Sequence, residues 1–242
     1  MFHHHIPELT IDSSINQIKN RRYPLLLNMY LDELDKDMWE EETLPFRRLM
    51  SYYSCAVMEI ETKLRVLNEE FSLEYDKNPI ESIESRIKSK DGIIKKLKRR
   101  GLPVTLESIE EHIWDIAGLR VICSFPEDVY MIEECLLEQD DIRLIQRKDY
   151  IKNPKPGGYR SLHLIVEVPI FLKNQKKWVK AEIQLRTMAM DFWASLEHKL
   201  RYKKDLDEDI ERAIEESLWI AAETCYKLDQ DMEAVRRKIQ KE

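Results

Sequence analysis

The stretch that decides the fold is residues 178–187, Trp-Val-Lys-Ala-Glu-Ile-Gln-Leu-Arg-Thr. Apolar and polar residues alternate in it, which is typical of a β-strand with one buried face. The polar face carries a carboxylate, an amide and a guanidinium, at Glu182, Gln184 and Arg186. These groups are costly to bury unless they are paired or bind a ligand. The strand therefore either lines a ligand site or exposes one polar face to solvent.

A second strand is predicted just before the first, at 159–168. The segment 173–177 between them is polar and too short for a helix, so we expect an antiparallel hairpin in a mixed sheet. Tyr159 and His163 share one face of this strand. The preceding loop, 155–158, contains two glycines, which let a backbone approach a ligand closely. Tyr159 either stacks on a nucleotide base or packs in the core.

Outward from the hairpin, short apolar runs alternate with short helical patterns. Further strands are predicted at 82–88, 118–125 and 142–149, and helices at 91–100, 105–113 and 127–138. This alternation is typical of an α/β or α+β core.

The two ends of the chain are predicted to be helical. Residues 1–78 form an N-terminal helical extension, with apolar residues at steps of three and four over 49–71 and a shorter run near 24–34. Residues 79–204 form the core, and residues 205–242 a C-terminal amphipathic helix.

The C-terminal helix has two possible apolar stripes. The one that contains Leu218, Cys225 and Met232 makes the better seam. The helix either packs back on the core or joins a partner subunit, and the sequence favours neither.

Composition excludes several classes of protein. The net charge of −7 argues against non-specific binding to DNA or an acidic membrane. The five glycines fit neither GxGxxG nor GxxxxGK[ST], which excludes Rossmann and P-loop nucleotide sites. No apolar run approaches the ~20 residues of a membrane span. We expect a cytoplasmic protein without a membrane partner. The histidines at 3–5 are either a metal-binding tail or a terminus without function.

Positive charge is concentrated in residues 86–100, with eight basic side chains and one acidic side chain. Arg86 and Lys88 project from one side of the predicted strand. In the helix that follows, one face presents Lys95, Lys98 and Arg99. The segment is either a clamp for several phosphates or a solvated basic helix.

Asp115 lies between a predicted helix and a predicted strand. It is either a cap or one half of a metal site that Glu182 completes. Proteins commonly hold Mg²⁺ with one or two carboxylates, together with substrate phosphates and waters. The spacing of the two residues in the sequence does not decide between these roles.

Five short motifs in this order resemble the synthetase domain of RelA/SpoT-type enzymes. They are Ser85-Arg-Ile-Lys-Ser89, Asp115-Ile-Ala-Gly-Leu-Arg120, Gly158-Tyr-Arg-Ser-Leu-His163, Glu182-Ile-Gln-Leu-Arg-Thr187 and Asp191-Phe-Trp-Ala-Ser-Leu-Glu-His198. The resemblance covers residues ~80–203. The chain is similar to the stand-alone small alarmone synthetases of the RelP and RelQ subgroups, and its long N-terminal extension favours RelP.

The resemblance implies a nucleotidyltransferase-like α+β fold, a mixed sheet of about five strands flanked by helices. It also implies a (p)ppGpp synthetase, a GTP diphosphokinase without hydrolase activity. Such enzymes transfer the β,γ-pyrophosphate of ATP to the 3′ hydroxyl of GDP or GTP, release AMP, and form homotetramers. The alternatives are a silent nucleotide- or RNA-binding regulator on the same scaffold, with RNA binding not favoured, and a nucleotidyltransferase that releases pyrophosphate.

Site residues follow from the resemblance. Glu182 is the expected general base, and it holds Mg²⁺ together with Asp115. Residues expected at ATP are Arg86, Lys88, Lys95, Lys98, Arg99 and Arg120. Residues expected at GDP or GTP are Lys148, Lys155, Tyr159, His163, Gln184 and Asp191, with Arg147 a less certain neighbour. Tyr159 is expected to stack on guanine.

Overall fold

A computed structural model describes residues 43–74, 78–201 and 208–239. The chain divides into two units, Met1–Phe46 and Arg47–Glu242, and the second contains the sheet and the site. The histidines at 3–5 and the predicted helical run near 24–34 lie outside the described residues.

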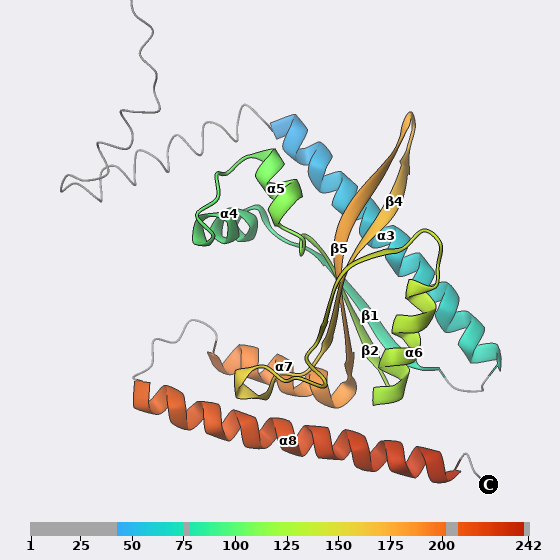
Figure 1. Ribbon diagram of the computed structural model, residues 1–242, viewed down its shortest axis with the longest axis vertical. Coiled ribbons are helices and arrows are strands. Elements are labelled where there is room, and N and C mark those ends of the chain that lie inside the picture. Colours follow the sequence, from blue (N-terminus) through green and yellow to red (C-terminus); the bar gives the residue numbers. More distant parts are fainter. Residues whose placement is uncertain (1–42, 75–77, 202–207, 240–242) are drawn as a thin grey trace, which may run out of the picture. The chain divides into compact units, whose positions relative to one another are not determined.

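Five strands form one mixed sheet in the order β1-β2-β5-β4-β3 (Figure 1). Their bounds are β1 Ile80–Ile87, β2 Ala117–Cys123, β3 Arg143–Asp149, β4 Leu162–Leu172 and β5 Gln175–Thr187. β2 and β5 are parallel, whereas the other neighbouring pairs are antiparallel. The α+β prediction is therefore confirmed, and the strand that carries Glu182 is the central one.

The β4–β5 hairpin is tighter than the sequence predicts. Leu172 pairs with Gln175, so only Lys173 and Asn174 remain in the turn. The run of polar residues at 173–177 suggests a loop, but an exposed hairpin tip tolerates polar side chains on both faces.

The two faces of the sheet differ in chemistry. Helices α3 (Thr43–Glu74) and α6 (Pro126–Leu137) pack on the apolar face. In α3 every residue of the predicted stripe is buried: Leu49, Tyr53, Ala56, Ile60, Leu64, Leu67 and Phe71. Figure 1 shows α6 on one side of the sheet and α4 and α5 on the other. The polar face is thus left to α4, α5 and the chain that follows β5.

Helices α4 (Lys90–Arg99) and α5 (Leu106–His112) have the predicted ends. The hydroxyl of Thr105 accepts a hydrogen bond from the N–H of Ser108 and caps α5. Gly101, with φ of +67°, follows α4 in the left-handed region that favours glycine.

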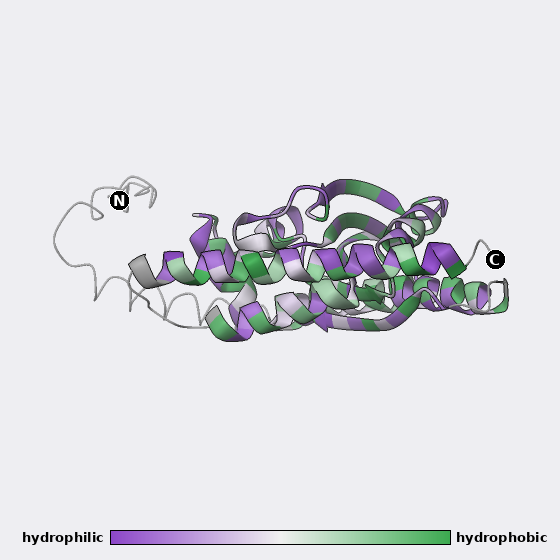
Figure 2. Ribbon diagram, turned by 90° about the horizontal axis from the view of Figure 1, so that it is seen from below, coloured by the Kyte–Doolittle hydropathy of each residue, from purple (hydrophilic) through white to green (hydrophobic). Residues whose placement is uncertain are grey.

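The chain after β5 forms α7 (Met188–Arg201) and α8 (Glu208–Ile239). α8 packs back on α7 through Leu218 and Ala222, with Cys225 half-buried beside them. Met232 of the predicted seam is half exposed, because Asp229 and Glu233 occupy the inner face at that level. Figure 2, seen from below, shows hydrophobic and hydrophilic residues alternating along the outer side of α8.

A buried carboxyl at the α8 interface gives a stability prediction. Burial raises the pKa of Asp229 to about 6, against a bond from the Thr187 hydroxyl that lowers it. The unfolded carboxyl ionises near its ordinary pKa, so the folded state binds more protons between about pH 4 and pH 6. Stability is therefore lost as pH rises through that window, at a cost of about 2–3 kcal/mol.

Asp229→Asn is expected to raise the free energy of unfolding at pH 7.5 by about 1–3 kcal/mol, and the gain disappears near pH 4. Urea unfolding at both pH values measures it. Asp231→Asn, at an exposed position of the same helix, is the matched control. A gain that does not depend on pH would contradict the role of ionisation.

No described helix combines the length and the apolar content that a membrane crossing needs.

Candidate active site

Strand register places polar side chains of all five strands on one face. Residues opposite each other in neighbouring strands lie on the same face of a sheet. Gly118 and Arg120 of β2 are opposite Glu182 and Gln184 of β5, and His163 of β4 is opposite Gln184. The residues that share this face are Glu84, Arg86, Arg120, Lys148, His163, Glu182, Gln184 and Arg186. It is the polar face that the sequence predicts.

Glu182 lies at the centre of this face and is held through both of its oxygens. Its Oε1 is 3.3 Å from Nδ1 of His163. Its Oε2 accepts a hydrogen bond of 2.8 Å from the amide of Gln184. On its other side, the His163 ring is 2.8 Å through Nε2 from the Tyr159 hydroxyl. Two of the predicted acceptor residues thus contact the predicted base directly.

Hydrogen bonding keeps Glu182 ionised although it is half-buried. Burial alone would raise its pKa, but the bonds from His163 and Gln184 outweigh burial and lower the pKa below its ordinary value. The negative charge of Asp115 acts in the opposite direction and raises the pKa of Glu182. Burial lowers the pKa of His163 despite the neighbouring Glu182. The site therefore presents an ionised carboxylate beside a neutral imidazole at neutral pH.

Arg186, on the same strand as Glu182, connects Tyr159 and Gln184 through hydrogen bonds. It is buried, and its Nη2 donates to the Tyr159 hydroxyl at 2.6 Å and to the Gln184 carbonyl oxygen at 2.7 Å. Its Nη1 pairs with Asp191 at 3.1 Å, and its Nε donates to Ser161 at 3.4 Å. The buried charge is thus matched by a carboxylate, as burial of a charge requires.

Asp115 stands at the start of β2 between two lysines. Its two oxygens lie 3.0 Å from Nζ of Lys88 and 2.7 Å from Nζ of Lys96. Burial would raise its pKa, but the two ammonium groups outweigh burial and lower it. Asp115 thus forms an ion pair with each of the two lysines.

A small pocket of about 70 Å³ opens on the β1–β2–β5 side of Glu182. Arg86 and Arg120 line it, and the Arg86 side chain lies over Gly118, where a Cβ would meet its Cγ at 3.5 Å. Arg120 pairs with Glu84 and Asp191, at 3.3 and 3.5 Å. Within the described residues its Nε is buried and has no hydrogen-bond partner. An unpaired buried donor is costly, so a ligand oxygen there would stabilise the site.

The β3–β4 side of Glu182 carries a second group of cations and rings. The ammonium of Lys155 lies 4.3 Å from the ring centre of Tyr150 and 4.9 Å from that of Tyr159. Lys148 is opposite His163 in the sheet. The Tyr159 ring also packs against the buried cluster around Trp193, so its packing role is real. Cationic groups thus flank Glu182 on both sides.

Helix α8 supports the turn that precedes Tyr159. The short 3₁₀ turn η1 (Pro156–Gly158) rests on it, with Gly158 against Ala222. The next residue but one, Arg160, pairs with Glu223 of α8 at 2.6 Å and donates to the carbonyl of Ile151. The C-terminal helix therefore fixes one wall of the site.

Some predicted residues lie elsewhere. In α4 the exposed positions include Lys95, Lys98 and Arg99. Lys96, which is not among the residues expected at ATP, reaches Asp115 instead. The helical spacing of Lys96 from the buried Ile93 could have identified it. Arg147 forks onto Glu133 of α6 on the apolar side and is not part of the site. The alternation of β5 places Arg186 on the polar face but indicates no role for it.

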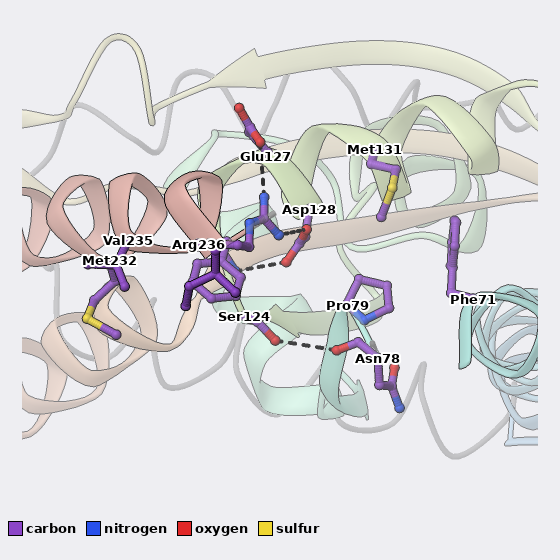
Figure 3. Close-up of a pocket in the computed structure, with 12 residues that line it drawn as sticks. Phe71, Asn78, Pro79, Ser124, Glu127, Asp128, Met131, Met232, Val235 and Arg236 are labelled. Carbon is purple, nitrogen blue, oxygen red and sulfur yellow. Dashed lines mark hydrogen bonds and ion pairs between the residues drawn. The ribbon is translucent and has the colours of Figure 1, made fainter. Parts of the chain in front are cut away.

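A larger pocket, of about 580 Å³, lies between the end of α3, α6 and α8 and contains none of the predicted site residues. Figure 3 shows Arg236 directed at Asp128 and Glu127. Its guanidinium nitrogens lie 2.6 and 3.0 Å from oxygens of these two carboxylates. Those charges pair with each other, and the rest of the lining is largely apolar. Size alone does not make it the active site.

Comparison with known proteins decides the family. The region found in RelA and SpoT proteins matches residues 85–207, just over half of the chain. The chain belongs to the RelA/SpoT family. GTP pyrophosphokinase YwaC of Bacillus subtilis is 43% identical over 212 residues, which cover 87% of this chain and 97% of YwaC. The predicted resemblance is confirmed at this level, and the RelP subgroup stays a prediction.

Two solved structures of one family member carry ligands. Small alarmone synthetase 1 of Bacillus subtilis, bound to its product pppGpp, has 35% identity and a TM-score of 0.70, covering 84% of this chain and 98% of that chain. The same synthetase bound to AMPCPP has 31% identity and a TM-score of 0.63, covering 84% and 99%. The family fold therefore extends over most of the chain.

Proposed function

We propose that this chain is a (p)ppGpp synthetase that transfers the β,γ-pyrophosphate of ATP to the 3′ hydroxyl of GDP or GTP and releases AMP. The observation that carries the proposal is an ionised carboxylate, Glu182, on the central strand between two cationic walls. The relatives support the same chemistry. One is a GTP pyrophosphokinase, and another is solved with its product pppGpp and with AMPCPP.

The two walls correspond to two substrates. Arg86 and Arg120, with Lys88 and Lys96 beyond them, form the donor wall at β1, β2 and α4. The orphaned Nε of Arg120 supplies a ready donor for a phosphate oxygen. Lys148, Lys155 and Tyr159 form the acceptor wall. The exposed face of α4 then contributes three more cations that can contact the triphosphate, Lys95, Lys98 and Arg99.

Glu182 is placed to accept a proton from the attacking hydroxyl. The 3′ oxygen bonds to the β phosphorus of ATP, the bond from that phosphorus to the bridging α,β oxygen breaks, and AMP leaves with this oxygen. The proton of the hydroxyl passes to Glu182, which is ionised because of its two N–H partners. The positive walls stabilise the charge that spreads over the transferred phosphates.

A magnesium site at Asp115 and Glu182 fits the donor set. Each Glu182 oxygen faces one N–H donor, and a carboxylate oxygen has a second lone pair for a further ligand. Asp115 offers oxygens held by two lysines, which can pair with phosphate instead. Asp115 and Glu182 would hold the ion, which would supply positive charge to offset the negative charge that develops on the phosphates.

The test is product analysis. Purified chain is incubated with ATP labelled in its β and γ phosphates, GTP or GDP, and Mg²⁺. Labelled pppGpp or ppGpp together with AMP supports the proposal. Release of pyrophosphate would identify a nucleotidyltransferase, and an inert chain that binds nucleotide would identify a regulator. The homotetramer and the cytoplasmic location stay predictions.

Tyr159→Ala is expected to raise the KM for GTP about 5- to 150-fold, because base stacking on an aromatic ring is worth ~1–3 kcal/mol. The KM for ATP, measured in the same assays, serves as the control, since Tyr159 lies on the acceptor wall. An unchanged KM for GTP would remove the stacking role and leave only packing against the Trp193 cluster.

A further inference from the structure

Five side chains form a closed circuit of polar contacts around the proposed catalytic base. It runs from Glu182 to His163, Tyr159, Arg186 and Gln184 and back to Glu182. The successive distances are 3.3, 2.8, 2.6, 2.7 and 2.8 Å. The residues come from β4, β5 and the segment just before β4, so the circuit spans the two central antiparallel strands.

The direction of each hydrogen bond in the circuit follows from its two ends. A guanidinium can only donate, and an ionised carboxylate can only accept. Arg186 donates to the Tyr159 hydroxyl, whose own proton is then available to Nε2 of His163. With Nε2 accepting, the neutral ring carries its proton on Nδ1 and donates it to Glu182.

The second arm has the same direction. Arg186 donates to the carbonyl oxygen of Gln184, which fixes the orientation of that amide. Its N–H group then faces Oε2 of Glu182. Both protons of Nη2 are used, one for each arm. Asp191 and Ser161 hold the remaining edge of the guanidinium, so that it cannot rotate freely.

We propose that Arg186 is a positioning residue: it orients both arms of the circuit so that each oxygen of Glu182 faces an N–H donor and the carboxylate keeps one rotamer. The proposal rests on the proposed function, in which Glu182 accepts a proton. Arg186 does not touch the reacting atoms. It acts through Tyr159 and His163 on one arm and through Gln184 on the other.

The first test reads the direction of the bonds without any activity. ¹⁵N NMR of the labelled full chain without nucleotide, with His163 assigned by its loss in His163→Gln, reports which ring nitrogen carries the proton. We expect the proton on Nδ1 alone. A proton on Nε2, in a neutral or a cationic ring, would overturn the proposal whatever the chain catalyses.

The second test separates kcat from KM. Tyr159→Phe removes the hydroxyl that links Arg186 to His163 but keeps an aromatic ring for stacking. We expect kcat to fall about 10-fold or more, while the KM for GTP changes less than about 3-fold, because misplacement of a catalytic group costs up to about 10²-fold. Tyr130→Phe is the control, because it removes a hydroxyl of α6 that donates to Asp149 at the end of β3.

The third test replaces the hub. Arg186→Lys keeps a positive charge beside Asp191 but loses the guanidinium that donates to both Tyr159 and Gln184. It is expected to lower kcat at least as much as Tyr159→Phe. Arg147→Lys removes a fork from Glu133 on the opposite face and is the matched control for stability and rate. In the double variant Tyr159→Phe/Arg186→Lys, the loss of kcat should be smaller than the product of the two single losses. Both substitutions break the same arm, from Arg186 through Tyr159 to His163.

The outcomes are separable. Wild-type kcat in both Tyr159→Phe and Arg186→Lys, or a loss confined to KM, would overturn the positioning role. If the wild-type chain makes no pppGpp, the proposed function fails, and the NMR experiment still decides the direction of the circuit. If Arg186→Lys does not fold, Tyr159→Phe and the NMR result decide alone.

Discussion

Glu182→Gln is expected to lower kcat for pppGpp synthesis by about 10²- to 10⁴-fold, the range that a general base contributes. The amide keeps the shape of the carboxylate but cannot accept the proton of the 3′ hydroxyl. Rates of label transfer from ATP to GTP, at saturating concentrations of both, measure the effect. The KM for either nucleotide should change far less than kcat, because the cationic walls remain.

The same substitution has a second, structural consequence. Both oxygens of Glu182 face N–H donors, so an amide at this position turns one of its own N–H groups toward a donor. The free energy of unfolding is therefore expected to fall by about 1–3 kcal/mol, the cost of an unsatisfied buried group. Unfolding in urea measures it, and the rate assays are run where the variant is folded.

Glu167→Gln is the matched control, since it removes the same charge from β4 outside the circuit. It should keep kcat within about 2-fold of wild type. If Glu182→Gln were as active as this control, Glu182 would not be the base. Neither the basicity nor the charge of Glu182 would then be needed for the transfer.

The sequence predicts the sheet well because its faces differ in chemistry. The alternation of apolar and polar residues predicts β5, with Glu182, Gln184 and Arg186 on one face. That face is the polar face of the sheet in the structure. The short apolar strand β2 and the stripe of α3 follow from local periodicity in the same way. These features depend on neighbours within a few residues, which a sequence displays directly.

Contacts between distant elements could not be predicted from periodicity. Lys96 rather than Lys95 meets Asp115, because the rotation of α4 is set by Ile93 and Leu97 in the core. The inner face of α8 includes Asp229, which an apolar stripe would not contain. Its partner Thr187 is 42 residues away and caps α7 as well. The register between elements is needed to find such pairs.

Gly158→Ala is expected to cost about 2–5 kcal/mol of folding free energy and to raise the KM for GTP. The backbone at Gly158 has φ of +93°, which an alanine adopts at a cost of about 1–2 kcal/mol. A Cβ there would lie 2.4 Å from the Cβ of Ala222 on α8, so helix and turn must also separate. Such overpacking costs about 1–3 kcal/mol. Tyr159 follows directly, so the displaced turn disturbs the acceptor wall.

Gly157→Ala isolates the steric part of this effect. Gly157 has φ of +82°, but a Cβ there would meet nothing within 4 Å, so only the backbone cost of about 1–2 kcal/mol applies. Removing the opposing Cβ in Gly158→Ala/Ala222→Gly should recover stability relative to the sum of the single variants, which urea unfolding of all four proteins measures. Equal destabilisation by the two glycine variants, without recovery in the double variant, would mean that α8 does not press on the turn in solution. The acceptor wall would then have to be held by Arg160 and Glu223 alone.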